Sequence, residues 1–134
     1  MEFKVVQYMT QTEQHLKKLY TNPDHFSFNR NSSIMTFDQN RVLLGDEPQK
    51  DLPDFYINAN YVDILGHQLI ATQGPLHSTF NNFWKMIDKK RVSAIFMLCE
   101  RVEKQKVKCD LYWPCKIEEP LDVGDFTIKL LSKE

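Results

Sequence analysis

The sequence predicts an α/β fold, and two neighbouring features carry most of that prediction. After Ser78 or Thr79, either of which can cap a helix, apolar residues follow the spacing i, i+3, i+4, i+7 of an amphipathic helix. They are Phe80, Phe83, Trp84 and Ile87. The next segment, residues 92–99, is almost continuously apolar, as a strand covered on both faces would be. A helix followed by a buried strand is typical of an α/β sheet.

Shorter patterns predict further strands. Residues 57–63 and 68–72 indicate an antiparallel pair of strands joined by a turn at Leu65, Gly66 and His67. Apolar and polar residues also alternate in residues 107–112 and 126–130, which predicts two more strands. These alternating strands, each half buried, are the third observation in favour of the α/β class.

The chain begins with a predicted helix and then becomes polar. Residues 5–20 carry an apolar stripe at helical spacing, and Pro23 disfavours helix in the residue before it. The sequence therefore predicts a helical segment in residues 1–25, followed by a domain in residues 26–134. Within that domain the stretch 45–53 has the composition of an exposed loop.

Composition excludes several classes of function. The chain has 134 residues, a formal net charge of −1 and no dense basic cluster, which argues against nucleic acid and membrane surfaces as partners. It has no apolar run near 18 residues and no secretory signal pattern. Three cysteines without a CxxC pair suit a reducing compartment, so we expect a cytoplasmic protein. The four histidines lie far apart in the sequence, and we expect neither a metal site nor a cofactor.

Seven fragments stand in an order that points to one family. They are "NRN" (29–31), "DQNRVLL" (38–44), "YINANY" (56–61), "IATQGPL" (70–76), "NFWKM" (82–86), "IFML" (95–98) and "KCDLYWP" (108–114). In this order and spacing the chain resembles the tyrosine-specific protein-tyrosine phosphatases over residues 26–132, about half of a phosphatase domain. The resemblance implies a mixed twisted sheet flanked by helices, with the carboxyl-terminal catalytic half absent from this chain.

The chemistry that the family uses has no counterpart in these residues. Family members carry a loop of His, Cys, five residues and Arg, in which a thiolate attacks the phosphate. Six residues after the three cysteines this chain has Gln105, Cys115 and Leu121, none of them an arginine. The family's acid loop, Trp-Pro-Asp, is also absent, because Trp113 and Pro114 are followed by Cys115. We therefore predict no catalytic residue here and no activity of the chain alone.

The resemblance assigns roles to residues near the family's active site. Asn31 stands where the family has a tyrosine that stacks on the substrate ring, so it is a candidate substrate-binding residue; the alternative is a plain turn residue. Arg30, Glu103 and Lys108 correspond to residues that support the active site. Glu103 and Lys108 lack their family partners, which favours a solvated loop glutamate and a strand-face lysine. Cys109 corresponds to a buried, non-catalytic cysteine.

Other matching residues are expected to be structural. They are Asp38, Arg41, Asn58, Gln73, Gly74, Pro75 and Trp84. A buried arginine needs a carboxylate partner, and Asp38 is close in sequence to both Arg30 and Arg41. Gly74 and Pro75 fit a tight loop beneath the active site, where glycine permits a close backbone approach.

Three hypotheses for function remain open. The chain is the amino-terminal part of a phosphatase that acts on phosphotyrosine proteins, or a short pseudophosphatase that acts as a binding, decoy or regulatory module. The third, an unrelated α/β binding domain, requires the seven motifs to coincide by chance. In both family hypotheses residues 92–99 lack part of their cover, so we expect a protein partner or self-association.

Overall fold

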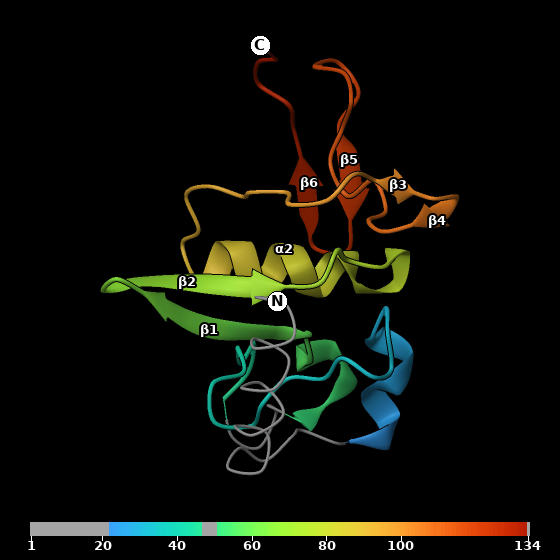
Figure 1. Ribbon diagram of the computed structural model, residues 1–134. Helices are drawn as coiled ribbons and strands as arrows, with labels where there is room; N and C mark the ends of the chain where they lie inside the picture. Colours follow the sequence, from blue (N-terminus) through green and yellow to red (C-terminus); the bar gives the residue numbers. More distant parts are fainter. Residues whose placement is uncertain (1–21, 47–50, 134) are drawn as a thin grey trace.

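The computed structural model describes residues 22–46 and 51–133 (Figure 1). The predicted helix in residues 5–20, and with it nearly all of the segment 1–25, lies outside the described residues. The 3-10 helix η1 (Pro23–Phe28) begins after Asn22, whose side chain accepts a hydrogen bond from the Asp24 amide, with Pro23 in the first turn. A second 3-10 helix, η3 (Pro53–Phe55), precedes the first strand.

The predicted antiparallel pair is confirmed. Strands β1 (Ala59–Ile64) and β2 (His67–Thr72) pair in register from Ala59 opposite Thr72 to Ile64 opposite His67. The turn between them holds Leu65 and Gly66 at φ 53° and 80°, the positive angles of a type I′ hairpin. A leucine in this conformation is strained, and Leu65 is also 95% exposed.

The other edge of β1 carries the polar segment that precedes it. Arg41 forms a β-bridge with Asn60, the Val42 amide donates to the Ala59 carbonyl, and the Tyr61 amide donates to the Asn40 carbonyl. These bonds leave β1 with partners on both sides. Its first residue is two positions later than predicted, since Ile57 is irregular and Asn58 lies in a bend before the strand.

The predicted amphipathic helix is also confirmed. The 3-10 helix η4 (His77–Thr79) leads into α2 (Phe80–Lys89), which buries Phe80, Asn82, Phe83 and Met86. The predicted cap is wrong in detail: Thr79 occupies the N-cap position, but its hydroxyl bonds the Leu76 amide and carbonyl at 3.0 and 3.1 Å, and makes no cap bond. Phe80, Phe83 and Met86 pack in one core with residues of other segments, which are Val42, Leu44, Ile57, Ala59, Cys109, Tyr112 and Val123.

The predicted strand at residues 92–99 is wrong for this structure. No strand is assigned there, and the chain runs as an irregular segment from α2 to β3 (Val102–Glu103) (Figure 1). An apolar strand needs a neighbour to bond its backbone, and no described strand lies against this one. The apolar pattern alone could not reveal whether that neighbour is present.

The remaining strands are short hairpins. β3 pairs with β4 (Lys106–Val107), and β5 (Leu121–Val123) pairs with β6 (Phe126–Ile128). The predicted strand in residues 107–112 thus stops after one residue, and the one predicted in 126–130 ends at Ile128. The α/β class is confirmed. However, the described strands form three separate two-stranded antiparallel sheets in place of one mixed sheet, because residues 92–99 do not join them.

Candidate functional site

The loop of Asn29, Arg30 and Asn31 is held by one side chain of a distant segment. Gln73 accepts a hydrogen bond from the Arg30 amide at 2.8 Å through Oε1, and its Nε2 donates to the Phe28 carbonyl at 2.8 Å. The Gln73 amide in turn donates to the Asn58 carbonyl. A glutamine with both ends of its amide engaged fixes two segments at once. The structural role expected for Gln73 therefore has a clear geometric basis.

Arg30 completes the same attachment. Its Nε donates to the Gly74 carbonyl at 2.9 Å and its Nη2 to the Pro75 carbonyl at 2.9 Å. Nη2 also lies 2.6 Å from an Asp110 carboxylate oxygen. Both side chains of this ion pair are partly exposed, so solvent screens the charge and the directional hydrogen bonds carry more of the stabilisation. Arg30 thus joins the loop of residues 29–31 to Gly74 and Pro75, and its role in supporting an active site stays a prediction.

The aspartate that pairs with Arg30 is not the one that the sequence suggested. Asp38 pairs with Nε of the buried Arg41 at 3.2 Å, as one reading of the sequence expected, and Asp51 pairs with its Nη2 at 2.7 Å. Asp110 was missed, since it is 80 residues from Arg30. Its position directly after Cys109 in the "KCDLYWP" motif is the signal that could have found it.

Asn29 is a second junction, and sequence reasoning missed it. Its Oδ1 accepts hydrogen bonds from the Tyr56 hydroxyl at 2.8 Å and from Asn58 Nδ2 at 2.9 Å. Asn58 Nδ2 also donates to the Ile34 carbonyl at 2.8 Å, so this side chain joins two segments; its structural role stays a prediction. Burial raises the pKa of the Tyr56 phenol, so the hydroxyl stays protonated and remains a donor.

A buried histidine packs against the tyrosine of this junction. The ring of His25 stacks on the Tyr56 ring with centroids 4.4 Å apart. His25 is buried, and burial lowers its pKa against the opposing effect of Asp24 and Asp51. The neutral imidazole is therefore the favoured form, and it packs as an aromatic surface.

Gly74 permits the closest approach in the site. A Cβ atom added at Gly74 would lie 2.6 Å from the Lys108 carbonyl oxygen and 3.0 Å from Cys109 Sγ. Cys109 is buried as expected, and burial raises the pKa of its thiol. The thiol nearest to the loop of Gly74 and Pro75 is thus kept protonated, the opposite of what a nucleophilic cysteine requires.

Asn31 lies on the surface beside this framework. Its Oδ1 accepts a hydrogen bond from the Ser33 amide at 2.9 Å, and its carbonyl accepts one from the Ile34 amide. This is a side-chain turn of the kind that asparagine favours. A contact of Asn31 with substrate stays a prediction.

Glu103 and Lys108 form a long, exposed ion pair. Their charged atoms are 3.9 Å apart, and both side chains are more than 40% exposed. Glu103 Oε1 also accepts from the Glu100 amide at 3.2 Å. Exposed pairs of this kind contribute little to stability. A role for either residue in supporting an active site stays a prediction, and the solvated positions agree with the plainer alternative.

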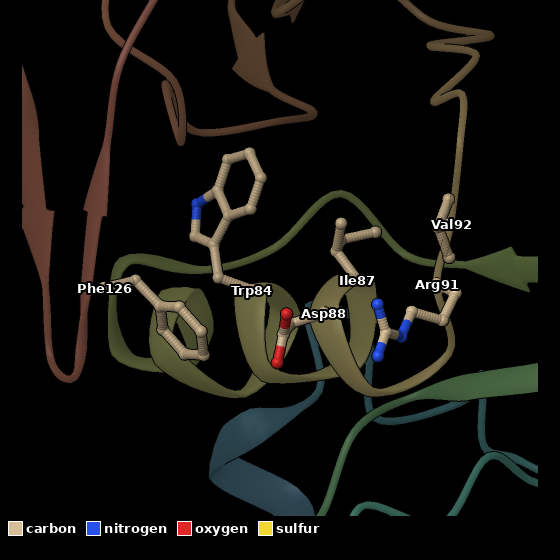
Figure 2. Close-up of a pocket in the computed structure, with 6 residues that line it drawn as sticks. All are labelled: Trp84, Ile87, Asp88, Arg91, Val92 and Phe126. Carbon is tan, nitrogen blue, oxygen red and sulfur yellow. The ribbon is translucent and has the colours of Figure 1, made fainter.

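Trp84 connects α2 to the "KCDLYWP" segment. Its indole Nε1 donates to the Tyr112 carbonyl at 3.0 Å. The indole also borders an open pocket of about 450 Å³, shown in Figure 2, which is lined by Trp84, Ile87, Asp88, Arg91, Val92 and Phe126. Trp84 is the one predicted site residue that lines this pocket.

The described residues contain no cluster of three or more His, Cys, Asp or Glu side chains that could hold a metal ion. Within the same residues no helix is long and apolar enough to cross a membrane.

Several tyrosine phosphatases are similar to this chain in sequence. Tyrosine-protein phosphatase 99A of Drosophila melanogaster is 40% identical over 114 residues, which is 84% of this chain and 9% of that protein. Human receptor-type tyrosine-protein phosphatase zeta is 44% identical over 110 residues, 79% of this chain and 5% of that protein. Mouse tyrosine-protein phosphatase non-receptor type 20 is 39% identical over 106 residues, 76% of this chain and 24% of that protein.

Solved structures agree with the sequence matches. The catalytic domain of human protein tyrosine phosphatase non-receptor type 18 superposes with a TM-score of 0.83 at 30% identity. The match covers 99% of this chain and 49% of that domain. A structure of PTPN18 in complex with HER2 phosphopeptides superposes with a TM-score of 0.85.

The profile of the family described as protein-tyrosine phosphatase matches residues 25–134. These residues include Arg30 and Gln73, which join the loop of residues 29–31 to the segment of Gly74 and Pro75. They also include Gly74, which packs against Cys109. The chain spans less than half of each of these relatives and solved structures. It belongs to the protein-tyrosine phosphatase family.

Proposed function

We propose that this chain supplies the substrate-side loop and its scaffold to a tyrosine phosphatase, and that by itself it does not hydrolyse phosphate esters. One observation carries the proposal. The loop of residues 29–31 is locked onto Gly74 and Pro75 by Arg30, while the nearest thiol, Cys109, is buried with a raised pKa.

The chemistry of the family explains why these residues do not suffice. Attack on a phosphate ester needs a thiolate, donors around the phosphate oxygens, and an acid for the leaving group. No cysteine of this sequence is followed by an arginine at the sixth position, and Trp113-Pro114 is followed by Cys115. The chain therefore contributes positioning, and a catalytic half supplies the nucleophile and the acid.

The substrate class follows from the family. PTPN18 is recorded in complex with HER2 phosphopeptides, and we propose phosphotyrosine proteins as the partners of a completed enzyme. Asn31 replaces a stacking aromatic ring, which forfeits about 0.5–1.5 kcal/mol beyond area burial. Binding of phosphotyrosine is therefore weak, and Asn31→Tyr strengthens it. A cytoplasmic location is part of the same proposal and rests on the three unpaired cysteines.

A second candidate is a short pseudophosphatase that acts as a binding, decoy or regulatory module. The apolar surface of residues 93–98 favours it, since an exposed apolar surface is typical of an interaction site. The two candidates differ in what they need, because only the first requires a catalytic half.

The decisive experiment is hydrolysis of p-nitrophenyl phosphate by the purified 134-residue chain. We expect no turnover above the uncatalysed rate, and no change in Cys99→Ser, Cys109→Ser or Cys115→Ser. Turnover that any one of these substitutions abolishes would overturn the proposal, because it would identify a nucleophile that the sequence pattern does not contain.

A further inference from the structure

The β3–β4 hairpin concentrates positive charge on the surface (Figure 1). It and the residues that flank it carry four exposed cations, which are Arg101, Lys104, Lys106 and Lys108. Of these four, only Lys108 has a carboxylate partner among the described residues, Glu103 at 3.9 Å. The charges of the other three are open to a ligand.

The carboxylates of this segment do not neutralise the tip of the hairpin. Glu103 is opposite Lys106 in the register of the strands, yet no ion pair joins the two in the described structure. The Glu103 carboxylate lies at the base of the hairpin, where Oε1 accepts a hydrogen bond from the Glu100 amide and Oε2 is 3.9 Å from Lys108 Nζ. The two glutamates interrupt the cations in the sequence, which is why no dense basic cluster is visible there.

Two features of the hairpin oppose its folding. The Lys108 amide donates to the Arg101 carbonyl at 2.8 Å, so these two cations occupy opposite positions, and like charges directly opposite destabilise a strand pair. The turn holds Lys104 and Gln105 at φ 48° and 64°, angles that favour glycine or asparagine. Packing does not explain either feature, because these side chains are exposed. A surface that keeps such costs has the properties of a binding site.

The hairpin adjoins the loop that is predicted to face the substrate. Arg30 Nη1 donates to the Val107 carbonyl at 3.4 Å, and the Lys108 carbonyl packs closely on Gly74. Arg30 directly precedes Asn31, the candidate substrate-binding residue. The flanks of an extended peptide held beside Asn31 therefore come near the cations of the hairpin.

We propose that the β3–β4 hairpin binds acidic residues that flank phosphotyrosine in a peptide substrate, and that Arg101, Lys104 and Lys106 select them. Carboxylates complement these cations, and several such contacts add specificity to a site where Asn31 offers no stacking ring. Because the contacts are exposed, each is weak and is screened by salt. The proposal rests on the proposed function, of which it narrows the substrate class.

The test is fluorescence anisotropy of labelled peptides with the purified 134-residue chain at low ionic strength. Two peptides contain phosphotyrosine flanked by glutamates or by glutamines, and two contain tyrosine with the same flanks. We expect the glutamate peptide of each pair to bind about fivefold tighter or more, and high salt to remove this preference. A variant with both Lys104→Gln and Lys106→Gln should reduce the preference to less than about twofold.

The matched control carries Lys129→Gln and Lys133→Gln, which remove the same charge from two exposed lysines after β6. It should keep the preference for glutamate, and thermal melting verifies that all variants fold. An equal preference in the two double variants, or no preference in the folded wild-type chain, would overturn the proposal. So would binding to phosphatidylserine vesicles that the hairpin variant loses while its peptide preference is unchanged, since this would assign the hairpin to a membrane. Because the preference needs no turnover, it fails or succeeds independently of the hydrolysis assay.

Discussion

Two regions of this chain differ in how far their polar and apolar groups find partners. Around Arg30, Asn58 and Gln73, polar groups from distant segments bond one another, and the apolar residues behind them share one core. In residues 93–98, the open segment, large apolar side chains are exposed and the backbone makes no hydrogen bond to other described residues. The first region makes its interactions among the described residues, whereas the second finds no such partners among them. A family motif therefore has different physical consequences depending on whether its partners are present.

The largest expected difference between the two regions is the effect of truncating one phenylalanine in each of them. Phe83 is buried in the core and Phe96 is exposed. We expect Phe83→Ala to lower the free energy of unfolding by about 3–5 kcal/mol, through lost burial and a cavity. Phe96→Ala should change it by less than about 0.5 kcal/mol. Urea denaturation of both variants measures this; equal losses would mean that the open segment is packed in solution.

A second pair of substitutions tests the contacts of the Arg30 side chain. Arg30 bonds the Gly74 and Pro75 carbonyls and Asp110, whereas the Arg101 side chain is exposed. Arg30→Ala should cost about 1–3 kcal/mol, because it leaves acceptors without their donor, and Arg101→Ala less than about 0.5 kcal/mol. The midpoints of chemical denaturation report both. A neutral Arg30→Ala would show that Gln73 alone holds the loop.

Low pH should lower the stability of the fold through His25, which stacks on Tyr56. Burial lowers the pKa of His25, so below its unfolded value of about 6.5 the unfolded state binds more protons than the folded one. Stability should therefore fall as the pH drops below about 6.5, by at most about 1.4 kcal/mol per pH unit for one proton. His25→Phe keeps the stacking surface without the titration and should flatten this part of the stability profile. An unchanged slope in that variant would assign the acid sensitivity to other groups.

The smallest expected effect is a gain of stability at the hairpin tip. Leu65 has φ 53° and makes the turn without packing against other residues. Asparagine and glycine tolerate positive φ better, so Leu65→Asn and Leu65→Gly should stabilise the chain by about 0.5–1 kcal/mol. A rise in melting temperature checks this. No rise would mean that the strain is relieved in some other way in solution.

The sequence could predict elements whose signals are local. The spacing of Phe80, Phe83 and Trp84 predicted α2, and alternation around a turn predicted the β1–β2 pair. The strand predicted at residues 92–99 is wrong because an apolar pattern indicates that a segment needs neighbouring strands and helices. The pattern cannot show whether those neighbours are present. The partner of Arg30 was missed for a related reason: 80 residues separate it from Asp110, and no periodicity spans that distance.

The central claim is that one chain contains a closed framework and an open segment, and amide hydrogen exchange of the purified chain tests it most directly. The hydrogen-bonded amides of β1, β2 and α2, together with that of Arg30, should exchange slowly, because they are bonded within the framework. Amides of residues 93–98 should exchange at nearly the rate of an unfolded peptide. Protection of residues 93–98 equal to that of α2 in the monomeric chain would contradict the account.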